Sequence, residues 1–121
     1  MRSVLVVDDS AVVRQAACAM LEKLGFSASG AETGLAALAR FRAAPPSAVL
    51  LEWDMPAMDG LTLLKHLRAE PGGRGAKVVF CTGRNDLPHI TAALAAGADE
   101  YLMKPFDENI LRSKLNAVGL L

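Results

Sequence analysis

The sequence lacks the features that mark secreted, membrane-spanning or strongly charged proteins. It has two cysteines, Cys18 and Cys81, far apart in apolar surroundings and without metal-type spacing, so we interpret them as buried free thiols. No apolar stretch approaches the roughly 20 residues needed to cross a bilayer, and the short apolar patch at 4–7 does not form a signal peptide. Thirteen basic residues balance thirteen acidic ones, which leaves no overall field to recruit nucleic acid or an anionic membrane. We expect a soluble, cytoplasmic protein.

The length sets a bound on domain organisation. A chain of 121 residues suits one compact domain with a real core and leaves little room for a second. No linker or low-complexity tract divides it, so we predict a single domain over residues 1–121 with no output domain after Leu121. A domain of this kind would produce its output by binding another protein.

Short β-branched runs alternate with longer Ala- and Leu-rich segments of helical period, which indicates strand–helix units around a parallel sheet. The predicted strands are 3–7, 26–30, 47–52, 77–82 and 99–103. The predicted helices are about 10–23, 33–43, 60–70, 87–96 and 107–118, with Ser10, Thr33 and Asp107 at their starts. The first and third strands are near-continuous apolar runs, typical of central strands covered by helices on both faces. In such sheets ligands bind at the carboxyl ends of the strands.

Polar residues gather at those strand ends. They are Asp8, Asp9, Glu52, Asp54, Thr82 and Lys104. If the first and third strands are neighbours, three or four carboxylates converge and need a cation, for which Mg²⁺ is suited by its preference for hard oxygen ligands. A lysine and a hydroxyl opposite them would complete a site for a phosphoryl group. Each signal alone is weak, because an Asp-Asp pair is commonly a helix cap and Lys-Pro commonly a turn. Together they favour a functional site.

Four motifs stand in a familiar order and spacing: "VLVVDDS", "VLLEWDMPAMDG", "VVFCTG" and "AGADEYLMKPF". Through them the chain resembles a response-regulator receiver domain over essentially its whole length, and most closely a single-domain, chemotaxis-type (CheY-like) one. The resemblance implies a flavodoxin-like, doubly wound (βα)5 sandwich of the α/β class with sheet order 2-1-3-4-5. It also implies a two-component phosphorelay, in which a histidine kinase or phosphotransfer protein passes a phosphoryl group to an aspartate.

The resemblance also assigns roles to residues at the predicted metal site. Asp8 and Asp9 match the acidic pair that holds Mg²⁺, with Asp9 expected to ligate directly. The backbone carbonyl of Asp54 and the carboxylate of Glu52, which stands at the acceptor position, would be further ligands.

The same resemblance assigns a switch and a partner surface. Thr82 matches the switch hydroxyl, Tyr101 the aromatic rotamer switch and Lys104 the phosphate-contacting lysine, aimed at the site by a cis bond to Pro105. The implied surface for a downstream target protein is formed by the fourth helix, fifth strand and fifth helix. It includes Thr91, Tyr101 and Lys114.

The chain departs from the family at Glu52, where receivers have Asp. The extra methylene moves the carboxylate outward by about 1.5 Å, and a misplacement of that size can slow a reaction about a hundredfold. As a phosphomimetic, Glu52 would place its charge where a phosphoryl oxygen lies and bond to Thr82 or Lys104. As a block, it would pair with Lys104 while Mg²⁺ binding or switching is lost. A third alternative is a natural Glu that is still slowly phosphorylated, and the sequence leaves natural and engineered origins open.

Other positions carry weaker hypotheses. Asp54 and Arg84 match positions that flank the acyl phosphate, where their opposite charges could bridge the entrance, or they are two solvated loop charges. His66 and His89 have no partner in ligand spacing, which favours surface or packing roles. Trp53 follows the acceptor position; a packing role suffices for it, and its fluorescence could report metal binding.

Two other classes of function compete with a signalling module. A Mg²⁺-dependent phosphotransferase or phosphohydrolase could use Glu52 and Asp54, but the chain has no cap or substrate-binding insertion. A flavodoxin-like cofactor binder would need a phosphate-binding loop after the first strand, where "DDSAVV" would instead repel a phosphate in the absence of metal. We therefore expect neither phosphate-ester turnover nor a bound flavin.

Overall fold

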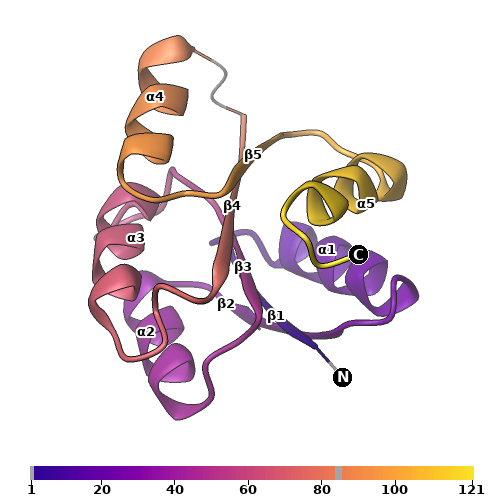
Figure 1. Cartoon of the computed structure of the whole chain (residues 1–121), viewed down its shortest axis with the longest axis horizontal. Helices are drawn as coiled ribbons and strands as arrows, with labels where there is room; N and C mark the ends of the chain where they lie inside the picture. The colour runs from indigo at the N-terminus through magenta and orange to yellow at the C-terminus, as the bar shows by residue number, and fades with distance from the viewer. Residues whose placement is uncertain (1, 84–85) are drawn as a thin grey trace.

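The computed structural model describes residues 2–83 and 86–121. Within them, five parallel strands alternate with five helices (Figure 1). The strands are β1 (Ser3–Val7), β2 (Ser27–Ala31), β3 (Ala48–Leu51), β4 (Lys77–Thr82) and β5 (Glu100–Met103). The helices are α1 (Ala11–Lys23), α2 (Gly34–Ala43), α3 (Gly60–Ala69), α4 (Leu87–Ala95) and α5 (Glu108–Ala117). The sheet order is β2-β1-β3-β4-β5, which confirms the predicted flavodoxin-like α/β fold.

The helices form two layers around the sheet. Figure 1 shows α1 and α5 on one side and α2, α3 and α4 on the other. Alternate residues of β1 point to opposite faces, because the side-chain period of a strand is two. Leu5 and Val7 therefore pack with the α2, α3 and α4 layer, whereas Val4 and Val6 pack with α1 and α5. The near-continuous apolar pattern of this strand is explained by burial on both faces.

Four of the helices begin at a side chain that accepts a backbone hydrogen bond. The caps are Ser10, Thr33, Asp59 and Asp107. Each satisfies one of the amide groups that the first turn of a helix leaves without a partner. The fifth helix, α4, starts at Asp86 with Pro88 in its first turn, and the described residues give Asp86 no such cap bond.

The element boundaries differ from the sequence prediction by one residue at several ends. Strand β2 begins at Ser27 instead of Phe26, because the Phe26 ring is buried in the core and its amide bonds to the carbonyl of Leu21. Strand β3 ends at Leu51, so Glu52 lies just past it. Cys81 is buried as predicted, but Cys18 is only half-buried, because α1 turns it partly toward solvent. No helix in the described part of the chain is long and apolar enough to span a membrane.

Candidate functional site

The strand register brings the predicted site residues to one edge of the sheet. Val7 of β1 pairs with Leu51 of β3, so Asp8 and Glu52 follow two paired residues. The Glu52 amide continues the ladder by donating to the Val7 carbonyl at 3.0 Å. On the other side of β3, the Lys104 amide donates to the Thr82 carbonyl at 2.9 Å, just past β5. The carboxyl ends of β1, β3, β4 and β5 therefore form a common site.

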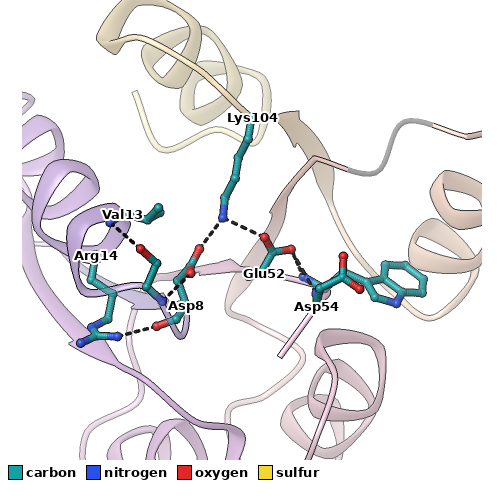
Figure 2. A network of polar contacts seen from close by, with 8 residues as sticks. Asp8, Val13, Arg14, Glu52, Asp54 and Lys104 are labelled. Carbon is teal, nitrogen blue, oxygen red and sulfur yellow. Dashed lines mark hydrogen bonds and ion pairs between the residues drawn. The ribbon is translucent and has the colours of Figure 1, made fainter. Parts of the chain in front are cut away.

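The Lys104 ammonium lies between the two buried carboxylates of this site (Figure 2). Its Nζ donates to Asp8 Oδ2 at 2.6 Å and to Glu52 Oε1 at 2.8 Å. Burial works against the charge on this ammonium, but the hydrogen bonds to Asp8 and Glu52 outweigh it, so the pKa of Lys104 is raised. One cation thus neutralises part of the charge of two carboxylates.

The second oxygen of Glu52 is bonded to the backbone that follows it. Glu52 Oε2 accepts from the amide of Trp53 at 2.5 Å and from the amide of Asp54 at 3.2 Å. Figure 2 shows the carboxylate lying between the Asp54 backbone and the Lys104 ammonium. Both oxygens of Glu52 therefore have donors, as a buried carboxylate requires.

Asp8 is fixed by its own turn and by α1. Its Oδ1 accepts from the Ser10 amide at 2.9 Å, and its backbone carbonyl accepts from Arg14 Nη1 at 2.7 Å. The Arg14 side chain lies against Gly30, where an added Cβ would come within 3.2 Å of Arg14 Cδ. Asp9, in contrast, is exposed. Sequence reasoning missed Arg14; its signal was a single arginine one turn into the helix that follows the acidic pair.

Whether magnesium fits this arrangement depends on the oxygen atoms that the site offers as ligands. The carboxylates of Asp8 and Asp9 and the backbone carbonyl of Asp54 are hard oxygens of the kind Mg²⁺ takes, with water completing its shell. Among residues 2–83 and 86–121, however, no three acidic, histidine or cysteine side chains stand together as a metal cluster. Glu52 is turned toward Lys104 and two amides. The oxygens of the acidic pair thus fit magnesium in kind, and the predicted role of Glu52 as a further ligand stays a prediction.

The predicted switch residues lie on β4 and β5. Thr82, at the end of β4, is fully buried. Tyr101 of β5 is also buried, and its ring stacks on Phe80 with centroids 6.4 Å apart. The bond between Lys104 and Pro105 is cis, as the resemblance implied. Arg84, the proposed partner of Asp54, lies outside the described residues, so the bridge between them stays a hypothesis.

Residues 4–116 match the family of the response regulator receiver domain. The chain belongs to that family. It is 35% identical to the phosphate regulon transcriptional regulatory protein PhoB of Escherichia coli K12, over 97% of the chain and 51% of PhoB. It is 36% identical to the transcriptional regulatory protein CseB of Streptomyces coelicolor, over 95% of the chain and 48% of CseB. The chain thus spans about half the length of these curated relatives.

Solved structures extend the comparison. The Vibrio cholerae chemotaxis protein CheY4 superposes with a TM-score of 0.93 at 29% identity, covering 98% of both chains. A two-component response regulator from Clostridium difficile superposes with a TM-score of 0.90 at 28% identity, covering 98% of this chain and 95% of the other. The receiver fold is therefore shared along nearly the whole chain.

This receiver has a second cluster beside the acidic site, around its single tryptophan. The Trp53 ring lies 5.2 Å from the ring of Phe80, centroid to centroid, and 4.8 Å from that of His89, which meets it edge-on. His89 Nδ1 in turn lies 2.5 Å from Asp86 Oδ2 at the start of α4. The sequence prediction of a surface or packing role for His89 did not foresee this contact, because residues 53 and 89 are distant in the chain.

Cys81 lies next to the site formed by Asp8, Glu52 and Lys104, on the opposite face of β4 from Phe80. Burial raises the pKa of its thiol to about 12, with the nearby Lys104 ammonium working against the shift. Such a thiol stays protonated at neutral pH, so it is a poor nucleophile and a poor metal ligand. Cys81 is a buried free thiol, as predicted.

Proposed function

We propose that this receiver signals by binding another protein, with Glu52 at the acceptor position as a carboxylate that takes up no phosphoryl group. The observation that carries the proposal is the ion pair between Glu52 Oε1 and Lys104 Nζ, 2.8 Å long. Lys104 matches the lysine that contacts the phosphoryl group in the family. Glu52 therefore already forms an ion pair with the lysine that a phosphoryl group would contact.

The geometry of the carboxylate supports a lack of phosphoryl uptake. A nucleophile must approach the phosphorus in line, and a displacement of about 1.5 Å removes that alignment. Both oxygens of Glu52 also accept hydrogen bonds, from Lys104 and from the amides of Trp53 and Asp54. These three bonds hold the carboxylate in its present orientation.

We further propose that the fixed charge mimics the phosphorylated state. The support is that Glu52 bonds the same lysine that the resemblance assigns to the phosphoryl group. The output would then leave through the surface of α4, β5 and α5, which includes Thr91, Tyr101 and Lys114. In the structure Lys114 pairs with Glu100 at 3.4 Å across α5 and β5. A histidine kinase or phosphotransfer protein is the proposed upstream partner.

Magnesium stays part of the proposal through the acidic pair. Asp8 and Asp9 would hold the ion together with the backbone carbonyl of Asp54, and the bound ion would supply positive charge to these carboxylates. Titration of Trp53 fluorescence with MgCl₂ tests this, with Asp9→Asn as the matched variant that removes the exposed carboxylate. A response to magnesium that is unchanged in Asp9→Asn would contradict the assignment.

The first test is the mass of the intact protein after incubation with acetyl phosphate and Mg²⁺. The protein and its Glu52→Asp variant are compared side by side. We expect a phosphoryl gain only in Glu52→Asp, because the shorter side chain restores the acceptor. A gain in the unchanged protein would overturn the proposal that Glu52 takes up no phosphoryl group. Steady release of phosphate from a phosphate ester would favour the competing enzyme class.

A second test separates a mimic from a block. Backbone amide chemical shifts of α4, β5 and α5 are recorded for the protein, for Glu52→Asp, and for Glu52→Asp with beryllofluoride, which imitates a phosphoryl group. If Glu52 is a mimic, the shifts of the protein lie near those of the beryllofluoride complex. If they coincide with those of free Glu52→Asp, Glu52 is a block. The single-domain arrangement, the cytoplasmic location and the absence of nucleic-acid contacts stay predictions of the sequence.

A further inference from the structure

A chain of contacts leads from the Glu52 carboxylate to the start of α4. Its first link is the hydrogen bond from the Trp53 amide to Glu52 Oε2, at 2.5 Å. A bond to a charged acceptor is stronger than one between neutral groups, so the carboxylate fixes the Trp53 backbone firmly. The Trp53 carbonyl accepts from the Gly60 amide at 2.8 Å, which holds the other side of this residue.

The second link is the Trp53 ring, which lies between two other rings. Phe80 of β4 is fully buried and contacts one side at 5.2 Å between centroids. His89 contacts the ring edge-on at 4.8 Å, a geometry in which aromatic pairs attract each other. Phe80 belongs to the central part of the sheet, whereas His89 belongs to α4, so the Trp53 ring joins the sheet to this helix.

The third link is α4 itself, which has few other contacts that hold it against the core. In the described part of the chain, Ala93 is the one fully buried residue of this helix, and Asp86 gives it no cap bond. Leu87 and Leu94 are 73% and 50% exposed. Asp86 bonds instead to the His89 side chain at 2.5 Å, which fixes the imidazole at the start of the helix. A helix with few buried apolar contacts opens locally at low free-energy cost.

We propose that His89 is a positioning residue that couples the Glu52 carboxylate to α4 through the Trp53 ring. The carboxylate places Trp53, Trp53 places His89, and His89 places the first turn of α4. A change of charge at position 52 therefore alters how often α4 opens. The coupling rests on contacts in the protein and requires no phosphoryl transfer, so it goes beyond the proposed function and can fail independently of it.

The test is a double-mutant cycle read by amide hydrogen exchange in α4. The four proteins are the unchanged chain, Glu52→Gln, His89→Ala and the double variant. Glu52→Gln replaces the charged acceptor by a neutral one of similar shape and weakens the bond to Trp53. We expect it to speed α4 exchange about tenfold in the presence of His89, and less than twofold in His89→Ala. An equal effect in both backgrounds, or less than twofold in both, overturns the proposal.

Two further variants separate coupling from simple packing. His89→Phe keeps an aromatic ring against Trp53, so the effect of Glu52→Gln on α4 should return in this background. His66→Ala removes the other histidine of the chain, which is exposed on α3, and should leave the effect of Glu52→Gln unchanged. Failure of Phe to restore the effect would overturn the role of the ring contact.

Tryptophan fluorescence gives an independent readout, because Trp53 is the single tryptophan of the sequence. We expect its emission to shift to longer wavelength in Glu52→Gln and in His89→Ala, as the indole loses its fixed surroundings. The shift in the double variant should be smaller than the sum of the two single shifts, because both act on the same ring. Additive shifts would show that the two residues act on Trp53 separately, which would contradict the coupling.

Discussion

Helices α4 and α5 both follow a strand that contributes to the site, yet they are held in place by different means. Helix α5 has Asp107 as a cap, Glu108 in its first turn, and the fully buried Leu111 and Leu115 on its inner face. Helix α4 contains no Asp, Glu, Lys or Arg, and within the described residues its fully buried side chain is that of Ala93 alone. Its start contacts Trp53 through His89.

The two helices should therefore differ in how easily they open. We expect a helix stabilised by its own cap and by core leucines to respond less to the state of the site. We expect a helix that contacts a residue next to the site, and has few other buried contacts, to respond more. Substitutions in the two helices should therefore have unequal effects.

Removing a buried leucine of α5 should lower the stability of the protein more than removing a leucine of α4. Leu115→Ala removes a fully buried side chain and should lower the free energy of unfolding by about 3 kcal/mol. Leu94→Ala in α4, at a side chain 50% exposed, should lower it by only about 0.5 kcal/mol. Urea titrations followed by circular dichroism measure both. Equal losses would remove the contrast between the two helices.

Lys104, in the connection from β5 to α5, pairs directly with Asp8 and Glu52. Lys104→Met leaves Asp8 and Glu52 buried without their ammonium and should cost about 2 kcal/mol of stability at pH 7. The raised pKa of Lys104 sets the sign of the pH dependence. The contribution is complete below the ordinary pKa of 10.5 and is lost as pH rises through the raised value. The difference between the protein and Lys104→Met should therefore shrink in alkaline solution; a constant difference would contradict the ion pair.

The residues that precede the two helices, Asp107 and Asp86, should differ in their smaller effects on stability. Asp107→Ala removes the acceptor of the Ile110 amide, a bond of 2.9 Å, and should lower stability by about 1 kcal/mol. Asp86→Ala removes no cap bond from α4 and should change global stability less than Asp107→Ala does. It should, however, shift Trp53 emission, because His89 loses its contact with the Asp86 carboxylate. A loss for Asp86→Ala as large as that for Asp107→Ala would show that α4 is capped after all.

The smallest predicted effect is on the labelling rate of Cys81, which packs with Leu111 and Leu115 of α5. Because burial raises its thiol pKa to about 12, Cys81 should react with iodoacetamide at pH 8 far more slowly than the half-buried Cys18. Leu115→Ala should speed the labelling of Cys81, whereas His89→Ala should leave it unchanged. Intact mass and peptide mapping follow both thiols. Faster labelling in His89→Ala would mean that the two helices open together.

Much of the fold followed from local sequence patterns. The strand and helix periods, and the caps Ser10, Thr33 and Asp107, lie within single elements and were predicted to within a residue or so. Phe26 and Cys18 were misplaced, because the exposure of a residue at the end of an element or on the flank of a helix depends on what packs over it. Asp59 was missed as a cap, although it lies one residue before the predicted start of its helix.

Local sequence patterns were enough to assign the site residues to the carboxyl edge of the sheet, because strand ends are fixed by apolar runs and turns that are short and local. The bonds between their side chains could not be predicted in this way. Lys104 meets Glu52 across 52 residues of chain and Asp8 across 96, and His89 meets Trp53 from a different element. Such contacts depend on side-chain direction and on the spacing of neighbouring strands and helices, which arise when the layers pack.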